Sequence, residues 1–438
     1  MFYPENISYC IISLGCSKNL VDSERINAAM SAAGFVAAET SEEAGIIIIN
    51  TCGFIQSAKE ESLSVIFDAL GIRDGSVAAP GGFGRKVAAV GCLTQRYFRD
   101  IAADIPELDF VYGIYDDGFV PALCTAFDIA AQIRPIEERK PLTPGLSYAY
   151  IKIADGCSNN CSYCAIPLIR GPHRSFSPEF IIGDAARAVA SGAKELIIVA
   201  QDIAAYRYKD TGLPELVDMI ARIDGVRWIR LLYCHPDHCD GRIIGLLKSN
   251  PLVVPYIDLP FQHASARILA SMGRKGSRQA YLDLVKRLRE EVPGIRIRST
   301  FMVGYPGETD GDFNELISFL KEAELDRVGA FAYSPEEGTP AAGLGETVPA
   351  KVKRRRLDRL MTLQRRISAR KLGEMVDREV DVLVEDRLDD GTFIGRTPYD
   401  APEVDGIFYL TGGGAVVNSI ARARVTDSVE YDLFGIVL

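Results

Sequence analysis

Short apolar segments alternate with amphipathic segments over residues 1–135. Apolar runs rich in β-branched residues occupy 7–14, 44–50 and 86–90, and segments with helical spacing follow at 22–33, 57–70 and 95–103. Strands and helices that alternate in this way are typical of an open α/β fold with a parallel sheet. The sequence therefore predicts an α/β domain over residues 1–135.

A second series of strand–helix units begins after a proline-rich linker at residues 133–145. The expected strands occupy 149–154, 195–199, 228–233, 256–259, 295–302 and 328–333, and expected helices include 178–191, 214–222, 278–291 and 310–323. Six units fall short of the eight that close a complete (βα) barrel. We therefore predict a six-unit partial barrel over residues 146–372.

The last part of the chain changes pattern twice. Residues 351–371 have helical spacing and include ten basic residues, which are interpreted as a solvated face, with RNA contact as the alternative. Strand-like segments then recur at 379–385, 392–396, 407–410 and 421–431. Their length and spacing predict a small five-stranded β-barrel over residues 375–438.

Three cysteines share one structural context in the first domain. Cys16, Cys52 and Cys92 each follow an expected strand directly. The carboxyl ends of parallel strands meet at one edge of a sheet, so these side chains are expected to gather there although they are far apart in sequence. A single cysteine after a strand is usually a small core residue, but three in the same relation favour an iron–sulfur cluster with three protein ligands.

A second set of cysteines stands at the start of the predicted partial barrel. Cys157, Cys161 and Cys164 form a C-x3-C-x2-C motif within eight residues. Three thiolates on one loop can hold three corners of a 4Fe–4S cluster and leave the fourth iron open for chemistry. A zinc knuckle and a disulfide loop are the alternatives.

The other cysteines are given structural roles. Cys10 and Cys124 are interpreted as core residues of the first domain. The segment from Cys234 to Cys239 also contains His235 and His238, so zinc binding there is an alternative to a structural or substrate-facing loop.

Composition narrows the class of protein. The chain is 47% hydrophobic and 25% charged, no apolar run reaches the length of a membrane helix, and the first residues lack a basic leader. These features, with cysteines in metal-binding patterns, predict a cytoplasmic protein without membrane contact.

The net charge of −10 counts against a general nucleic-acid-binding surface. Residues 377–438 carry 13 acidic and 5 basic residues, and this net charge of −8 favours a basic protein partner.

The two cysteine sets carry a resemblance to a known family. The C-x3-C-x2-C motif resembles the signature of radical S-adenosylmethionine enzymes. Residues 13–24 read S-L-G-C-S-K-N-L-V-D-S-E and resemble the RimO branch of the methylthiotransferases, although Ser17 stands where many members have Pro. Asn50-Thr51-Cys52 and Gly91-Cys92 match the other two positions of that family's N-terminal cluster, and residues 377–438 resemble a TRAM domain.

The resemblance implies cofactors and their contacts. It implies two 4Fe–4S clusters and S-adenosylmethionine, with Tyr163 near the adenine and Gln201 at the position of a G-G-E motif in related enzymes. Gln201 is then the candidate contact for the ribose or the amino group. Independently of the resemblance, Arg298 on the fifth strand is a candidate for the cofactor carboxylate, since guanidinium–carboxylate pairs are bidentate and strong, and an ordinary charge pair of the barrel wall is the alternative. The turn at residues 304–309, G-Y-P-G-E-T, resembles a family turn close to the adenine. No general acid or base is assigned.

The resemblance also implies a reaction. It is the addition of a methylthio group to the β-carbon of an aspartate in the small-subunit ribosomal protein S-twelve, with an external electron donor. The first alternative is a tRNA adenosine methylthiotransferase of the MiaB type, and the acidic C-terminal segment counts against it. The second alternative is a non-enzymatic iron–sulfur redox sensor, and the repeated strand–helix units count against that.

Overall fold

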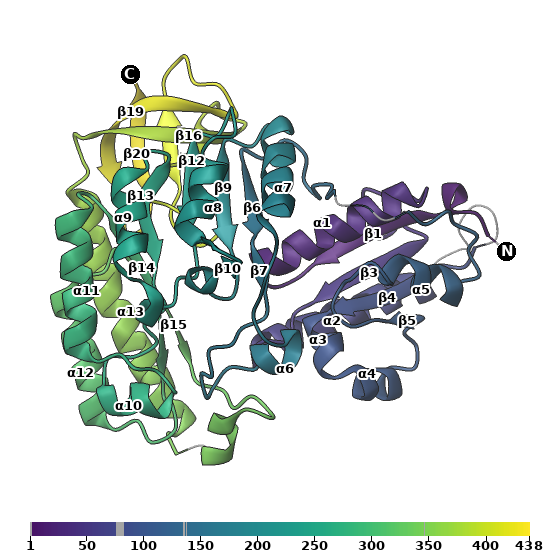
Figure 1. The fold of residues 1–438 in the computed structure, drawn as a ribbon, viewed down its shortest axis with the longest axis horizontal. Helices are drawn as coiled ribbons and strands as arrows, with labels where there is room; N and C mark the ends of the chain where they lie inside the picture. Colours follow the sequence, from purple (N-terminus) through teal and green to yellow (C-terminus); the bar gives the residue numbers. More distant parts are fainter. Residues whose placement is uncertain (1, 76–82, 135, 137, 346) are drawn as a thin grey trace. The chain divides into compact units, whose positions relative to one another are not determined.

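A computed structural model describes residues 2–75, 83–134, 136, 138–345 and 347–438 (Figure 1). Residue contacts divide the chain into two compact units. The first unit comprises Met1–Pro144, Gly156–Ser158 and Cys164–Pro172, and the second comprises Gly145–Asp155, Asn159–Tyr163 and His173–Leu438. Apart from Gly156–Ser158 and Cys164–Pro172, the predicted partial barrel thus belongs to the same compact unit as the C-terminal β-barrel. The boundaries of the three predicted domains remain predictions, and residues 135 and 137 of the predicted linker lie outside the described residues.

The first unit is built on a parallel sheet of order β2-β1-β3-β4-β5. Its strands are β1 (Ser8–Ser13), β2 (Val36–Ala37), β3 (Ile46–Thr51), β4 (Lys86–Gly91) and β5 (Phe110–Val111). Its helices are η1 (Pro4–Asn6), α1 (Ser17–Ala32), α2 (Gln56–Asp74), α3 (Cys92–Arg96), α4 (Phe98–Asp104), α5 (Phe119–Ala126) and α6 (Ile166–Arg170). The α/β fold predicted for this region is confirmed.

The central strand β3 shows why an almost continuous apolar run forms this sheet. Side chains alternate between the two faces of a strand. Ile46 and Ile48 accordingly join one hydrophobic cluster, and Ile47 and Ile49 join another on the opposite face. A parallel sheet that is covered on both faces needs apolar residues at every position, so β3 reads as a run of isoleucines.

Two helix boundaries of the first unit differ from the sequence prediction. Helix α1 begins at Ser17, directly after Cys16, instead of at residue 22. The helix expected over 95–103 is divided into α3 and α4, because Tyr97 leaves the helical region with φ −123° and ψ 39°. The early start of α1 follows from the short turn after β1, and the division of the second helix follows from the non-helical backbone of Tyr97; helical periodicity reveals neither.

The second unit contains a six-stranded parallel sheet of order β15-β14-β13-β12-β9-β6. The strands are β6 (Tyr148–Lys152), β9 (Glu195–Val199), β12 (Trp228–Leu231), β13 (Val253–Asp258), β14 (Arg296–Val303) and β15 (Arg327–Ala332). The helices between them are α7 (Pro178–Ala190), α8 (Leu213–Ile220), α9 (Gly241–Ser249), α10 (Ala266–Ser271), α11 (Arg278–Glu291) and α12 (Asp310–Ala323). All six predicted strands are present, and α9 and α10 were not predicted.

Short strands and 3-10 helices lie between the main strands and helices of the second unit. They are β7 (Ala154–Asp155), β8 (Arg174–Ser175), β10 (Arg207–Tyr208), β11 (Thr211–Gly212), η2 (Ile203–Ala205), η3 (Pro236–His238) and η4 (Pro340–Leu344).

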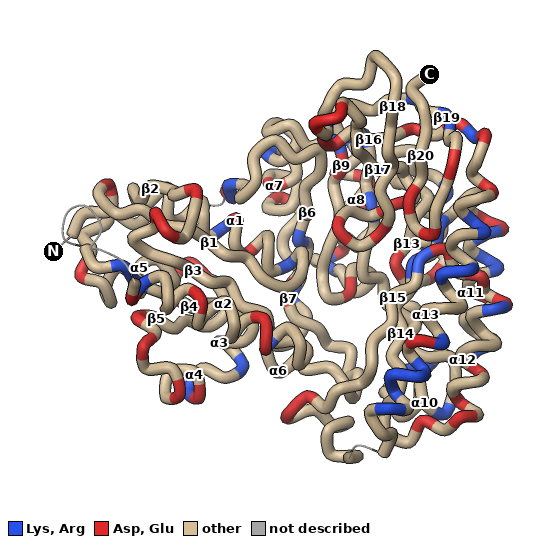
Figure 2. The backbone as a smooth tube through the Cα atoms, turned by 180° about the vertical axis from the view of Figure 1, so that it is seen from behind, with Lys and Arg blue, Asp and Glu red and all other residues tan. Residues whose placement is uncertain are grey.

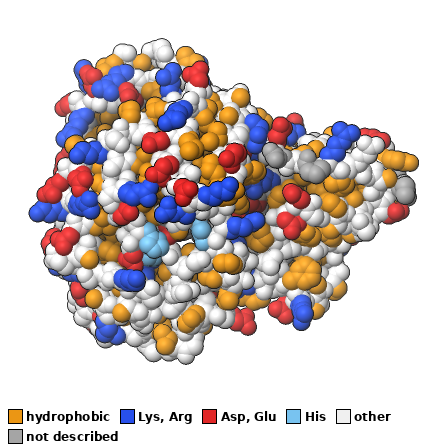
Figure 3. Space-filling view, in the orientation of Figure 1, with side chains coloured by type: hydrophobic (Ala, Val, Ile, Leu, Met, Phe, Trp, Pro, Cys, Tyr) orange, Lys and Arg blue, Asp and Glu red, His pale blue; other side chains and the backbone are white. Residues whose placement is uncertain are grey.

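Figure 3 shows that charged side chains of both signs are interspersed over the helical face of this unit. No helix in the described ranges combines the length and apolarity needed to cross a membrane.

The chain ends in a closed barrel of order β16-β17-β18-β20-β19, as predicted for a five-stranded β-barrel. Its strands are β16 (Glu379–Arg387), β17 (Phe393–Arg396), β18 (Phe408–Thr411), β19 (Ser419–Ser428) and β20 (Leu433–Val437). The predicted strand at 421–431 corresponds to β19, and β20 after it was not delimited by the sequence. Closure brings β20 beside β18, where a Cβ on Gly435 would lie 2.6 Å from the Phe408 ring.

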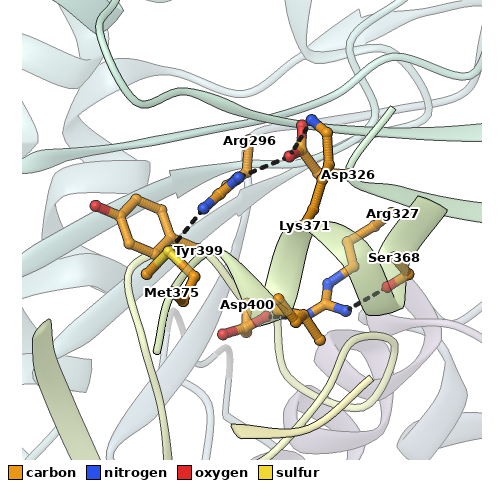
Figure 4. A pocket seen from close by; sticks show the side chains of 9 residues that line it. Arg296, Asp326, Arg327, Ser368, Lys371, Met375, Tyr399 and Asp400 are labelled. Carbon is orange, nitrogen blue, oxygen red and sulfur yellow. Dashed lines mark hydrogen bonds and ion pairs between the residues drawn. The ribbon is translucent and has the colours of Figure 1, made fainter. Parts of the chain in front are cut away.

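Buried ion pairs join the barrel and the partial barrel within the second unit. Glu195 on β9 pairs with Arg230 on β12 at 2.6 Å and with Arg396 on β17 at 2.7 Å, and Arg396 also pairs with Glu385. Figure 4 shows a second contact, in which Asp400 reaches a buried arginine of β15 beside helix α13 (Ala350–Gly373). The C-terminal barrel is therefore docked by charge pairing inside one unit.

Breaking this network is expected to destabilise the second unit. Burial alone would raise the pKa of Glu195, but Arg230 and Arg396 outweigh burial and hold that pKa below its usual value. Arg396→Met would leave a buried carboxylate with one partner removed, so we expect a loss of about 3–5 kcal/mol in the free energy of unfolding. Urea unfolding followed by the fluorescence of Trp228, the only tryptophan of the chain, measures this loss.

A matched control is available on the same barrel. Arg422 also pairs with a carboxylate, Asp381, but the Arg422 side chain is 51% exposed. Solvent screens such a pair, so Arg422→Met should cost much less than Arg396→Met. Equal losses for the two variants would contradict a stabilising role of the buried network. Because the folded pKa of Glu195 lies below the unfolded value near 4.3, its contribution is present above about pH 4.3 and is lost as acid protonates it.

Candidate metal centres and cofactor site

The first candidate centre lies at the carboxyl edge of the parallel sheet in the first unit. Cys16 precedes α1 directly, Cys52 follows the last residue of β3, and Cys92 begins α3 after β4. Strands β1, β3 and β4 are neighbours in the sheet, and the charges of Cys16 and Cys92 both act on the Cys52 thiol. The Cys16 and Cys92 thiols therefore lie within electrostatic range of Cys52, at the sheet edge where the sequence analysis expects them.

Glycine allows two of these cysteines to approach closely. Gly15 has a φ of +88°, and a Cβ there would lie 2.8 Å from the Cys52 sulfur. A side chain at this position would clash with Cys52 and would also strain the backbone. The Gly15-Cys16 pair is therefore explained by the close approach of the two strand ends.

The three thiols differ in their readiness to ionise. Cys16 is exposed to solvent, but the protein atoms packed around its sulfur oppose ionisation; Lys18, Arg170 and backbone N–H donors outweigh this and hold the pKa of the thiol below its usual value. Burial raises the pKa of Cys52 to about 12, and burial also raises the pKa of Cys92 although Arg170 opposes the rise. Thiolate is the metal-binding form, so a bound metal would have to displace protons from Cys52 and Cys92.

Two asparagines that the sequence analysis did not single out hold these strand ends. The side-chain amide of Asn19 donates to the Leu14 and Thr51 carbonyl oxygens, each at 2.9 Å. The amide of Asn50 donates to the carbonyl oxygen of Asn19 and to Ser23, each at 2.8 Å. Both asparagines lie in the quoted motifs, and buried amides beside candidate ligands were the signal that could have identified them.

The second candidate centre is the loop between β7 and α6. In its first part, the Cys157 N–H donates to the Gly171 carbonyl oxygen at 3.1 Å, within the first unit. In its middle part, the Ser162 N–H donates to the Met272 carbonyl oxygen at 3.0 Å, within the second unit. Cys157 is buried, whereas Cys161 and Cys164 are partly exposed. The three cysteines are close together in the chain, with Cys157 and Cys164 in the first unit and Cys161 in the second.

Gln201 lies two residues beyond the end of β9, at the carboxyl edge of the six-stranded sheet. Its side-chain amide donates to Asp155 at 3.2 Å, and Asp155 also pairs with Lys152 at 2.9 Å. The Gln201 Oε1 atom is buried and has no hydrogen-bond partner among the described residues. An unpaired buried acceptor at this edge can receive a hydrogen bond from a bound ligand.

Tyr163 and Asp202 also lie around the middle of the cysteine loop. The Tyr163 hydroxyl is 3.3 Å from a guanidinium nitrogen of the buried Arg274. Asp202 accepts hydrogen bonds from Asn159 at 2.8 Å and from His238 at 2.7 Å. The structure therefore places Tyr163 and Gln201, two of the three predicted cofactor contacts, on segments next to this loop.

Arg298, the third predicted contact, is used differently. It is the third residue of β14, near the start of the strand, and it pairs with Asp258 at 3.2 Å and with Asp405 of the C-terminal barrel at 3.6 Å. The carboxyl ends of the strands, where a barrel site forms, lie at the other end of β14. Two carboxylates already balance the Arg298 charge, so its placement does not support the predicted contact with the cofactor carboxylate.

Two other predicted features have structural explanations. Gly304 has a φ of +75°, and a Cβ there would lie 2.4 Å from the Lys353 side chain, so helix α13 explains this glycine. In the segment from Cys234 to Cys239, both cysteines are buried. Among the described residues no three His, Cys, Asp or Glu side chains are gathered as one metal ion requires.

Comparisons with known proteins agree with this architecture. Residues 8–113 match the uncharacterized protein family UPF0004, residues 151–320 match the radical SAM superfamily, and residues 376–438 match the TRAM domain.

Relatives that match over the full length identify the family more narrowly than the three domain matches do. The ribosomal protein uS12 methylthiotransferase RimO of Geobacter sulfurreducens is 40% identical, over 98% of this chain and 98% of its own length. The RimO of Desulforudis audaxviator is 42% identical, over 98% of this chain and 96% of its own length. The chain belongs to the RimO family of radical SAM methylthiotransferases.

Solved structures show the same fold at low sequence identity. The radical S-adenosylmethionine methyltransferase TsrM from Kitasatospora setae, solved with cobalamin and a 4Fe–4S cluster, matches with a TM-score of 0.59. The match covers 77% of each chain at 12% identity. The cobalamin-dependent enzyme OxsB matches with a TM-score of 0.51 at 9% identity, over 82% of this chain and 56% of its own.

RimO-type enzymes use S-adenosylmethionine and two 4Fe–4S clusters, and the residues of this chain fit these groups. Two separate sets of three cysteines supply thiolates, the ligands that such clusters require. Gly15 leaves room for Cys16 and Cys52 to approach each other, and Gln201 offers an unpaired acceptor beside the cysteine loop.

Proposed function

We propose that this chain adds a methylthio group to the β-carbon of an aspartate in ribosomal protein uS12, in the cytoplasm. The single observation that carries the proposal is the pairing of two cysteine triads with full-length similarity to RimO proteins. The ribosomal substrate is taken from the names of those relatives. The reaction also requires an external one-electron donor.

The two triads are assigned different roles. Cys157, Cys161 and Cys164 would hold the radical-generating cluster, and Cys16, Cys52 and Cys92 would hold the auxiliary cluster. When bound, the first cluster with S-adenosylmethionine would supply a radical that removes the β-hydrogen, and the auxiliary cluster would supply the sulfur, carrying a methyl group from a second S-adenosylmethionine. Each triad leaves one iron of its cluster without a cysteine, so each cluster has a position for an exogenous ligand.

Side chains beside the cysteine loop would bind S-adenosylmethionine. Gln201 presents its unpaired Oε1, which suits an ammonium or hydroxyl donor. Tyr163 presents an aromatic ring whose hydroxyl is tied to Arg274, so the ring is held in one orientation for packing against the adenine.

The acidic C-terminal barrel is the proposed docking surface for uS12. Part of its negative charge is used inside the chain, because Asp400 pairs with Arg327 and Asp405 pairs with Arg298. Asp405 is therefore unsuitable for recognising a partner, although its charge contributed to the sequence-based prediction. Exposed acids remain on the β16–β17 hairpin, at Asp386, Asp389 and Asp390. Charge complementarity would draw a basic ribosomal protein to this hairpin.

The basic helix α13 gives less support to RNA binding than its sequence does. Figure 2 shows Lys and Arg recurring along this helix. Arg356 pairs with Glu308 at 2.8 Å, Lys371 pairs with Asp326 at 2.7 Å, and Arg370 pairs with Glu324 at 2.6 Å. Arg356 and Lys371 are used for packing within the second unit, whereas Arg370 forms a solvent-exposed pair and Arg354, Arg355, Arg365 and Arg366 are exposed. The exposed part of this basic face keeps RNA contact as the alternative that product analysis tests.

Product analysis tests the proposed function. The reconstituted enzyme is given S-adenosylmethionine, a one-electron reductant and either uS12 or bulk tRNA at the same ionic strength. We expect mass spectrometry to find a methylthiolated aspartate in uS12 and no methylthiolated adenosine. A methylthiolated adenosine together with unmodified uS12 would overturn the assignment in favour of the tRNA-modifying branch.

Charge reversal of the acidic hairpin is expected to slow modification of uS12. Replacing Asp386, Asp389 and Asp390 with lysine should lower kcat/KM for uS12 about tenfold or more at low salt, because steering depends on complementary charge. The rate of S-adenosylmethionine cleavage without uS12 should not change. The difference from the unmodified chain should shrink as salt is added.

A matched control uses acids on a different element. Glu290 and Glu315 are acids of helices α11 and α12, away from the C-terminal barrel sequence. Their replacement with lysine changes net charge without altering the hairpin. If this variant slows uS12 modification as much per charge as the hairpin variant does, the hairpin is not the docking surface.

A further inference from the structure

Arg170 is a buried cation beside one of the auxiliary cysteines. It is the last residue of α6, six positions after Cys164 in the chain, and its side chain is 2% exposed. Its Nη2 atom lies 3.4 Å from the Cys92 sulfur, 2.8 Å from Asn19 Oδ1 and 3.0 Å from Asp22 Oδ2. All these residues belong to the first unit.

Packing holds the guanidinium at this position. Ala165 and Ile169, on the segment that carries Arg170, are buried against Cys92 in one small hydrophobic cluster. Asn19, which shares the Arg170 Nη2 atom with Cys92, is itself fixed by two hydrogen bonds to backbone carbonyl oxygens. The packing of Ala165 and Ile169 against Cys92 and the hydrogen bonds of Asn19 therefore both hold the Arg170 guanidinium next to the Cys92 sulfur.

Arg170 is the side chain that can donate to Cys92 when this sulfur is bound to iron. In the free thiol form, the Cys92 sulfur lies 3.6 Å from Asn19 Oδ1 and can donate to it. A metal-bound thiolate has no proton to give, whereas Arg170 keeps its protons at any physiological pH. The guanidinium then offers both a hydrogen bond and a positive charge to the ligand sulfur.

These two effects act on the reduction potential of a cluster. Hydrogen bonds to the sulfurs and the net charge around a cluster are among the factors that set its potential. Reduction adds negative charge, so a nearby cation stabilises the reduced form and raises the potential. A nearby carboxylate such as Asp22 has the opposite effect.

We propose that Arg170 is a positioning residue of the auxiliary cluster, which fixes the Cys92 ligand and raises the reduction potential of that cluster, with Asp22 as its opposing charge. The proposal rests on the assignment of the auxiliary cluster to Cys16, Cys52 and Cys92. It assigns to Arg170 a role that is separate from holding iron or binding S-adenosylmethionine.

The test uses a full-length chain that holds the auxiliary cluster alone. In this parent, Cys157, Cys161 and Cys164 are replaced with alanine, and iron is reconstituted anaerobically. Arg170→Met, Asp22→Asn and Lys86→Met are each added to the parent. A redox titration monitored by electron paramagnetic resonance measures the midpoint potential, and iron analysis measures retention of the cluster. Lys86 is the control cation, because it lies at the opposite end of β4 from Cys92, roughly 20 Å away.

The expected shifts have opposite signs. Arg170→Met should make the midpoint potential more negative, and Asp22→Asn should make it less negative. Lys86→Met, which removes a cation that pairs with Asp109 at 2.9 Å, should leave it unchanged. A general loosening of the site would not shift the midpoint potential in opposite directions in the Arg170 and Asp22 variants.

Other outcomes overturn the proposal. An Arg170→Met potential equal to that of the parent would do so, and so would shifts of the same sign in the Arg170 and Asp22 variants. If Arg170→Met holds too little iron to titrate, Arg170→Lys supplies the measurement, with an altered potential expected and an unchanged one contradicting the role. A parent without iron would instead overturn the auxiliary-cluster assignment, and this proposal with it, so the two failures are distinguishable.

Discussion

Replacing Cys157, Cys161 and Cys164 with alanine is expected to abolish cleavage of S-adenosylmethionine. The unmodified chain should hold about eight irons after anaerobic reconstitution, and the variant about four, because one of two 4Fe–4S clusters loses every protein ligand. Without this cluster no electron reaches the cofactor, so 5′-deoxyadenosine should fall to the background of the assay. Iron and sulfide analysis, together with chromatography of the nucleoside product, measures both effects.

The control for this variant removes cysteines that lie elsewhere. Cys10 is partly buried on β1 and Cys124 is buried on α5, and neither belongs to a proposed triad. A Cys10/Cys124 double alanine variant should keep about eight irons and full cleavage. Unchanged iron content in the Cys157/Cys161/Cys164 variant would show that this loop does not hold a cluster.

Replacing Cys16, Cys52 and Cys92 with alanine is expected to separate radical formation from sulfur transfer. This variant should hold about four irons and should still form 5′-deoxyadenosine, because the loop that contains Cys157 is unchanged. It should make no methylthiolated uS12, because the proposed sulfur-supplying cluster is absent. The two products are measured in the same reaction mixture, by chromatography and by mass spectrometry of uS12.

The interpretation of this second variant depends on its fold. Cys52 and Cys92 are buried, so their replacement also removes packing at the sheet edge. Circular dichroism and the Trp228 fluorescence of the second unit serve as checks on folding. Loss of 5′-deoxyadenosine in a variant that passes these checks would contradict the independent roles proposed for the two triads.

Much of the fold was predictable from local patterns. The isoleucine run in β3 and the six apolar segments of the second unit predicted their strands, because buried parallel strands require apolar residues on both faces. Helices α9 and α10 were missed, because Gly241 and Gly245 weaken the helical pattern of α9 and α10 has only six residues. Strand β20 was missed because its boundary depends on pairing with β18, which lies far away in sequence.

The site was predictable where chemistry dictates residue type and spacing. Cysteine is the ligand that both proposed clusters would require, so the positions of Cys16, Cys52 and Cys92 after strands were informative in the sequence itself. Arg298 shows the limit of this approach. An arginine on a barrel strand suits a cofactor carboxylate, but whether it meets one depends on its height along the strand and on its neighbours.

The acidic residues of the C-terminal barrel differ in their surroundings, which their number in the sequence does not reveal. The sequence counts every acid equally, and its net charge of −8 favoured a basic protein partner. In the folded chain Asp400 and Asp405 are paired with arginines of the partial barrel, whereas Asp386 and Asp389 remain exposed. Folding thus separates the acids that pair with arginines inside the chain from the exposed acids that a partner protein can reach.

The sequence by itself determined the order of architectures, the two cysteine triads and the family resemblance, because periodicity and ligand spacing are local properties of a chain. Only the tertiary structure decided which charges meet. The contacts of Arg170 with Cys92 and of Arg396 with Glu195 join residues 78 and 201 positions apart in the chain. Such pairs depend on how strands and helices from distant segments are stacked, and no local pattern encodes that arrangement.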